Sequence, residues 1–189
     1  MGGPGVEDNR TGLGVLLEMA RSWPRNLSGR VEVRFVATGA LALDAAGAQA
    51  VARQIVEEWP PKPTLLINLH APGCSTKMFL LGKGQVLEQA EAAAKSLWIP
   101  KFRLVTQRSG LGPLGHHPPE CEGQPAVSLI GYMPWTRKTD LNGNRPTFID
   151  PAGVAAAAQL ATEIALRWAK LQGAAPQVDS LAQSSQNPG

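Results

Sequence analysis

Two carboxylates and an amide, Glu7, Asp8 and Asn9, are consecutive in a Gly- and Pro-rich stretch that leads into a helical pattern. Carboxylates on a turn at the N-terminus of a helix suit a metal ion or a charged substrate. A simpler interpretation is that Asp8 or Asn9 caps the helix and that the glycines shape the turn. These residues alone favour capping, so the rest of the chain must decide between the two interpretations.

Histidines provide the next candidates for chemistry. His70 ends an apolar run that is typical of a core strand, and open α/β sheets place their sites at the carboxyl edge of such strands. His116, His117, Glu120 and Cys121 are all metal-ligand types and lie in a Gly- and Pro-rich segment. Adjacent residues in a stretch stiffened by proline rarely converge on one ion, so this second group favours a pocket lining or a plain loop.

The elements that must position these residues alternate between strands and helices. Hydrophobic spacing predicts helices at 11–23, 44–59, 85–98 and 151–171, and the last begins with Asp150 as its cap and Pro151 at its first position. Apolar runs predict strands at 31–37, 64–70, 77–81, 102–105 and 125–131. The alternation predicts an α/β fold, a three-layer α/β/α sandwich on a mostly parallel mixed sheet. We expect one domain over 1–171 and a disordered tail over 172–189.

Composition limits the classes of function. The 189 residues are 43% hydrophobic and 17% charged, which is typical of a soluble globular protein. The net charge of +3 comes from scattered residues, so we expect no nucleic-acid partner. No apolar run approaches the roughly 20 residues of a membrane span, and we expect no signal peptide. Two cysteines, Cys74 and Cys121, are too few for a disulfide framework, and the compartment stays open.

The order of five motifs resembles the zinc aminopeptidase family, metallopeptidase family 28, which includes bacterial leucyl-type aminopeptidases. The family turn Gly-Ala-Asp-Asp-Asn-Ala-Ser-Gly corresponds to residues 5–12, and its strand Ile-Arg-Phe-Val-Ala-Phe-Gly corresponds to residues 33–39. Asn-Leu-Asp, Gly-Ile-Pro-Ala-Val-Ser and Ile-Asp-Pro correspond to residues 68–70, 123–128 and 149–151. The resemblance covers Gly2 to Leu171 and implies a zinc-exopeptidase-like fold.

The resemblance also implies where metal ligands would lie. The family uses two zinc ions, held by two histidines and three carboxylates, and a Glu as general base. Its bridging Asp corresponds to Glu7, and Asp8 keeps the neighbouring carboxylate. The next Asp ligand corresponds to His70, and the terminal His ligand corresponds to Asp140. Glu7, His70 and Asp140 are therefore the candidate metal ligands of a residual single-metal site, and a hydrogen-bonded His70 filling the old pocket is the alternative.

Other positions depart from the catalytic pattern. The Glu-Glu pair that supplies the general base and a ligand corresponds to Leu41 and Ala42, so no catalytic residue is assigned. The family's first His ligand belongs to a His-Tyr-Asp element upstream of the turn, and this sequence has no counterpart to it. His116 corresponds to a pocket residue, and Trp135 lies in the loop over the ancestral pocket. Asp8, His116 and Trp135 are the candidate pocket or substrate-binding residues.

Three hypotheses follow from these correspondences. The favoured one is a zinc-aminopeptidase-like domain that has lost peptidase activity, holds zinc sub-stoichiometrically or not at all, and binds a peptide or protein partner. The second is a metallo-aminopeptidase or related hydrolase whose site is rebuilt from Glu7, His70, Asp140 and His116. The third is a piece of a longer protein, in which an exposed sheet edge favours a homo-oligomer. Whether the chain is an enzyme is thus left open by the sequence.

Overall fold

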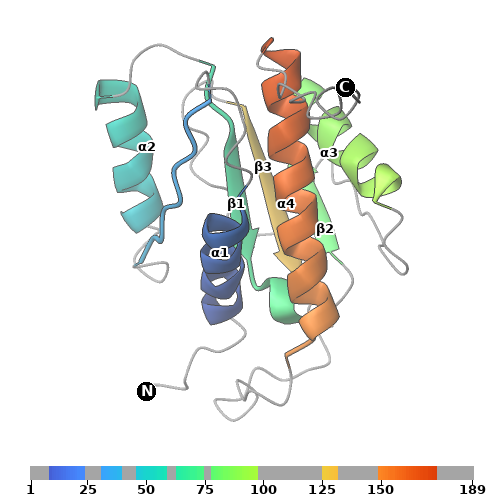
Figure 1. Ribbon diagram of the computed structural model, residues 1–189. Coiled ribbons are helices and arrows are strands. Elements are labelled where there is room, and N and C mark those ends of the chain that lie inside the picture. The colour runs from blue at the N-terminus through green and yellow to red at the C-terminus, as the bar shows by residue number, and fades with distance from the viewer. Residues whose placement is uncertain are drawn as a thin grey trace, which may run out of the picture.

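The structure is a computed structural model that describes residues 9–23, 31–39, 46–58, 63–74, 78–97, 125–131 and 149–173. Its elements follow the order α1 (Thr11–Ser22), α2 (Ala46–Glu58), β1 (Leu66–His70), the short 3₁₀ helix η2 (Pro72–Cys74), β2 (Met78–Gly82), α3 (Gly84–Ser96), β3 (Ala126–Gly131) and α4 (Pro151–Leu171), as Figure 1 shows. Apart from η2, each of these helices and strands lies within about two residues of the range that hydrophobic spacing predicts.

The described strands form one mixed sheet in the order β1-β3-β2. β1 and β3 are parallel, with a register that runs from Leu66 opposite Ala126 to His70 opposite Ile130. β2 pairs with the other side of β3 in the antiparallel direction. β3 is therefore central, which explains why its sequence is a nearly continuous apolar run and why it is almost wholly buried.

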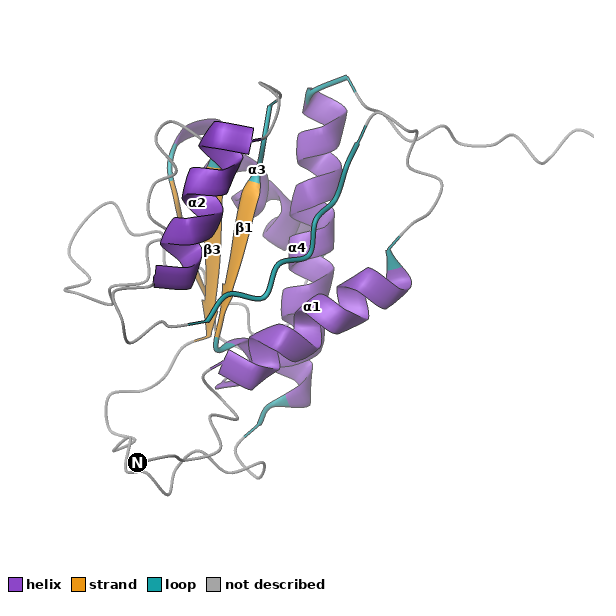
Figure 2. Ribbon diagram, turned by 90° about the vertical axis from the view of Figure 1, so that its left-hand side faces the viewer, coloured by secondary structure: helices purple, strands orange, loops and turns teal. Residues whose placement is uncertain are grey.

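The helices cover both faces of this sheet. Figure 2 shows α2 on one side of the strands, and α1 and α4 on the other side. α3 packs against α4 and β2, so it belongs to the same layer as α1 and α4. The three-layer α/β/α arrangement expected from the alternation of strands and helices is confirmed.

The main core lies between the sheet and the layer of α1, α3 and α4. Branched side chains from the strands meet small residues of α3 and α4, and this lets the helices approach the sheet closely. Leu80, Leu129, Leu160, Ala90, Ala93, Ala157 and Ala161 have no exposed surface. The Ala-rich pattern of α4 is therefore a packing feature that brings the start of this helix to the carboxyl edge of the sheet.

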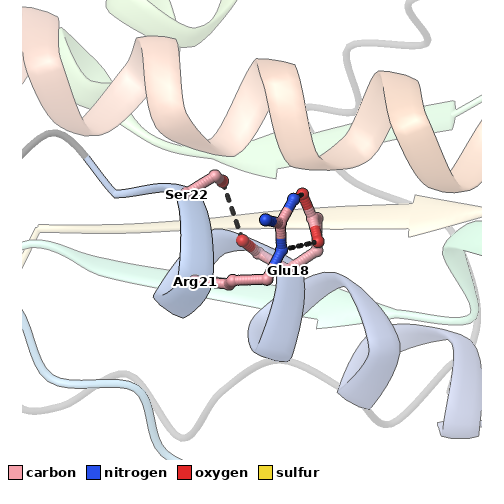
Figure 3. A network of polar contacts seen from close by, with 3 residues as sticks. All are labelled: Glu18, Arg21 and Ser22. Carbon is pink, nitrogen blue, oxygen red and sulfur yellow. Dashed lines mark hydrogen bonds and ion pairs between the residues drawn. The ribbon is translucent and has the colours of Figure 1, made fainter.

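The last turn of α1 carries a local polar network on the protein surface (Figure 3). Arg21 donates from Nε and Nη2 to the carboxylate of Glu18, at 2.9 and 2.7 Å, and Ser22 Oγ donates to the Glu18 carbonyl at 2.7 Å. The hydrogen bond from Arg21 lowers the pKa of Glu18, and the same bond raises the pKa of Arg21. These hydrogen bonds lie in the exposed last turn of α1, at the end of the helix away from the candidate site.

One predicted strand is wrong. Residues 31–37 do not form a strand of the described sheet, although burial alternates along them: Val31, Val33 and Phe35 are half-buried while Glu32 and Arg34 are exposed. Phe35 packs edge-on against Trp23, with ring centroids 5.9 Å apart. Alternation in a sequence reports which side chains face the protein, and it does not require a hydrogen-bonded neighbouring strand.

Two further predictions lie outside the described residues, namely the strand at 102–105 and the tail from residue 174 onward. Within the described ranges, the helices are all too short or too polar to cross a membrane.

Candidate functional site at the carboxyl edge of the sheet

His70 is the last residue of β1 and lies at the edge of the sheet where β1 and β3 both end. The preceding Leu69 packs into the core shared with α1, α3 and α4. Because side chains alternate along a strand, His70 projects to the opposite face of the sheet. Only 7% of His70 is exposed, so it is a buried titratable residue at the place where α/β sheets build their sites.

The turn after His70 has an unusual backbone. Ala71 has a φ of +47°, a left-handed conformation that costs an ordinary L-residue about 1 kcal/mol or more. Its carbonyl oxygen lies so close to Gly131 that a Cβ at this glycine would overlap it. The ends of β1 and β3 therefore approach each other more closely than any residue except glycine at position 131 permits.

Asn9 holds this turn from the start of α1. Its Nδ2 donates to the carbonyl of Leu69 at 2.8 Å, and its Oδ1 accepts from the backbone N–H of Ala71 at 2.9 Å. The N-cap of α1 is Arg10, which makes no side-chain capping bond. The sequence predicts Asp8 or Asn9 as the cap of α1; for Asn9 this is wrong, because its amide is engaged with a turn 60 residues away in the chain, and Asp8 lies outside the described residues.

Two further hydrogen bonds tie the helix starts to the same turn. The backbone N–H of Gly73 donates to Thr11 Oγ1 at 3.3 Å, and the Gly73 carbonyl accepts from the backbone N–H of Asp150 at 2.8 Å. We call the assembly of Asn9, Thr11, residues 69–73, Gly131 and Asp150 the edge junction. It joins the starts of α1 and α4 to the carboxyl ends of β1 and β3.

Asp150 confirms the cap predicted for α4. Its Oδ1 accepts from the backbone N–H groups of Ala152 and Gly153, at 3.0 and 3.3 Å, and Pro151 occupies the first turn. These bonds satisfy two of the otherwise free N–H groups at the start of the helix. The Asp150 side chain is thus used locally while its backbone N–H is part of the edge junction.

A polar pair lies next to His70 on the same face of the sheet. Asn68 and Ser128 are opposite each other in the parallel register, and Asn68 Nδ2 donates to Ser128 Oγ at 3.3 Å. Ser128 is 2% exposed, so this hydrogen bond satisfies a buried hydroxyl. The face that carries His70 is therefore more polar than the face that packs on α4.

The described part of the edge does not by itself form a zinc site. Within the described ranges, no three residues of the His, Cys, Asp and Glu types gather around one point. His70 is a suitable ligand type, whereas the Asp150 carboxylate caps α4 and the Asn9 amide holds the turn. One donor is fewer than the three or four protein ligands that zinc sites use, so any zinc ion at this edge would need further ligands from beyond the described ranges.

The other candidate residues fall outside the described ranges: Glu7, Asp8, Leu41, His116, Trp135 and Asp140. The chain nevertheless enters two of their segments from the edge junction. Glu7 and Asp8 directly precede Asn9, and the segment with Trp135 and Asp140 runs from Gly131 to Ile149. Of the sequence-derived candidates, the structure thus describes His70 alone, and it adds Asn9, which sequence reasoning assigned to a local cap.

Comparisons with known proteins support the fold. No protein-family model matches the chain, and no curated protein matches it by sequence. Among solved structures, the zinc aminopeptidase BSAP from Bacillus subtilis superposes with a TM-score of 0.68 at 23% identity, over 87% of this chain and 42% of that one. The LapA aminopeptidase from Legionella pneumophila gives 0.63 at 16% identity, over 86% and 46%. The chain has the α/β fold of these aminopeptidases and spans less than half of their length.

Proposed function

We propose that this chain is a zinc-aminopeptidase-like domain that binds a peptide or protein partner at the carboxyl edge of its sheet and does not hydrolyse peptide bonds. The observation that carries the proposal is the pair Leu41-Ala42, which stands where the family resemblance places the general base and a ligand. Neither side chain can accept a proton or bind a metal ion. The fold shared with two zinc aminopeptidases is consistent with an aminopeptidase-like frame, and the correspondence of positions 41 and 42 rests on the sequence motifs.

The loss is large on physical grounds. A positioned general base contributes roughly 10²–10⁴ to the rate of a hydrolytic step. A metal site with fewer ligands also lowers the pKa of its bound water less effectively, which weakens the nucleophile. The general base and one metal ligand would both come from the positions of Leu41 and Ala42. We therefore expect no peptide hydrolysis by this domain.

The edge junction offers a frame for binding without chemistry. It is held by long-range hydrogen bonds from Asn9, Thr11 and Asp150, so it does not have to be ordered by the ligand. Ligands of open α/β sheets bind outside the carboxyl ends of the strands. The edge junction lies at the carboxyl ends of β1 and β3. A peptide or a segment of a partner protein is the ligand that suits a peptidase-like frame.

Zinc analysis and turnover test the proposal together. Purified protein should contain much less than one zinc per chain, and it should not release p-nitroaniline from leucine p-nitroanilide with or without a chelator. The tripeptide Leu-Gly-Gly should bind in calorimetry, and the His70→Gln variant should bind it more weakly. Stoichiometric zinc together with turnover that stops on chelation would refute the proposal.

A second function is favoured by one observation. His70, a zinc-ligand type, is buried at the strand end where the family resemblance places an Asp ligand. With Glu7, Asp140 and His116 it would form the rebuilt metal site of a metallo-aminopeptidase or related hydrolase. In that case His70→Ala abolishes zinc binding and activity, whereas His117→Ala leaves both unchanged. Equal zinc content in wild type and His70→Ala excludes this second function.

A further inference from the structure

We infer that Asn9 is a positioning residue for His70, and that it acts through the backbone on both sides of the histidine. The carbonyl of Leu69 belongs to the peptide unit before His70, and the N–H of Ala71 belongs to the peptide unit after it. Asn9 binds both, at 2.8 and 2.9 Å. One side chain therefore fixes the two backbone dihedral angles of His70, and only the rotamer of the imidazole remains to be set.

The geometry imitates a neighbouring strand. In a parallel ladder, the main-chain N–H and C=O of one residue bond the C=O before and the N–H after the residue opposite it. The primary amide of Asn9 presents the same donor and acceptor pair to β1. His70 is thus paired with Ile130 of β3 on one side and with the Asn9 amide on the other.

The inference deepens the proposed function, since it concerns how the candidate site at the sheet edge is kept in one conformation. Ala71, directly after His70, is held at a φ of +47°, which an unrestrained alanine rarely adopts. The bond from its N–H to Asn9 is one of the contacts that maintain this conformation. Without it, the chain after His70 relaxes toward ordinary dihedral angles and the imidazole moves with it.

Gly12 provides an independent way to disturb the same contact. A Cβ at Gly12 would overlap the Asn9 side-chain amide. Replacement of a helical glycine by alanine ordinarily stabilises a helix. A changed His70 resonance in Gly12→Ala would therefore come from the lost Asn9 contact and not from a weaker helix. Gly14 lies in the same helix and has nothing within 4 Å of its Cβ position, which makes Gly14→Ala the matched control.

The test follows the His70 side chain by NMR in the 189-residue protein with ¹³C-labelled histidine. The chain has three histidines, and the His70 resonance is assigned by its disappearance in His70→Gln. In Asn9→Ala and in Gly12→Ala, the His70 resonance should broaden or split. It should keep the wild-type width in Gly14→Ala and in Asp150→Ala, because the latter removes a helix cap without touching the peptide units that flank His70.

Two outcomes overturn the inference. The first is an unchanged His70 resonance in folded Asn9→Ala and Gly12→Ala. The second is an equal change in Asp150→Ala, which would mean that any destabilised junction perturbs the histidine. If Asn9→Ala does not fold, Gly12→Ala decides the question, because it leaves Asn9 in place. Failure of the wild type to bind Leu-Gly-Gly would refute the proposed function and leave this result intact.

Discussion

The starts of α1 and α4 lie at the same end of the molecule and use similar residues in opposite ways. Asp150 accepts two N–H groups of its own helix, at 3.0 and 3.3 Å. Asn9, one residue before the N-cap of α1, makes no such bond and reaches the turn after β1 instead. Both helix starts are nevertheless anchored to Gly73, through Thr11 in one case and the Asp150 backbone in the other.

In α4 the polar residue at the start caps its own helix, whereas beside α1 the polar residue holds the turn after β1. α4 is 21 residues long and has a capped start, so it forms a stable support for the sheet. α1 is shorter, its N-cap residue Arg10 makes no side-chain capping bond, and the neighbouring Asn9 binds the backbone around His70. We therefore expect changes at the start of α1 to affect the candidate site, and changes at the start of α4 to affect stability alone.

The largest effect is expected where the ends of β1 and β3 approach each other most closely. Gly131→Ala places a Cβ against the carbonyl of Ala71, and this backbone cannot move without disturbing the whole edge junction. The free energy of unfolding should fall by about 3 kcal/mol, the upper range for an overpacked site. Urea denaturation measures it. The control Gly14→Ala should raise stability by up to about 1 kcal/mol.

Asn9→Ala should cost about 2 kcal/mol, because it leaves the buried N–H of Ala71 and the carbonyl of Leu69 without their partner. The loss should appear in the urea midpoint with an unchanged slope. A cost no larger than that of an ordinary surface substitution would mean that water replaces the amide, and the distinction between the two helix starts would then lose its energetic basis.

Asp150→Ala should cost about 1 kcal/mol, the usual value for a lost N-cap, because the backbone bond from Asp150 to Gly73 remains. Asp150→Asn should be close to wild type, since an amide oxygen also caps. Both variants should bind Leu-Gly-Gly with the same affinity as the wild type. A loss of Leu-Gly-Gly binding in Asp150→Ala, at unchanged fold, would contradict the separation of roles.

The smallest effect is expected at the other end of α1. Arg21 lowers the pKa of Glu18, so the pair stabilises the protein above the unfolded-state pKa of this carboxyl, and the contribution is lost as pH falls through the lowered folded-state pKa. Both side chains are exposed, and solvent screens the interaction. Glu18→Gln should slightly lower the melting temperature at pH 7 and leave it equal to wild type at the acid end. A larger difference in acid would contradict this sign.

The sequence predicts the local features of this fold well. Asp150 followed by Pro151 predicts a cap and a first turn, and the structure has both, because all the participating atoms lie within three residues. His70 is predicted at the end of a strand from the apolar run directly before it, which is also a local feature, and the structure has it there. The family resemblance predicts the three-layer architecture, and the superposition with zinc aminopeptidases agrees with it.

Long-range partners explain the failures. Asn9 looks like a cap because Asn before a helix usually is one, and nothing near it in the sequence points to Leu69 or Ala71. The alternation at 31–37 predicts a strand, but whether an extended segment finds a hydrogen-bonding neighbour depends on the rest of the sheet. The proposed ligands Glu7 and Asp140 stay predictions.

The edge junction also has a consequence for the order in which the protein folds. Its bonds from Asn9 connect residues that are 60 and 62 positions apart in the chain, so large loops must close before either of them forms. These contacts are therefore expected to be absent from the folding transition state and to form late. Substitutions at Asn9 should then accelerate unfolding and leave the refolding rate nearly unchanged. The residues that fix the backbone of His70 would thus govern the lifetime of the native state through the unfolding rate, and have little influence on the folding rate.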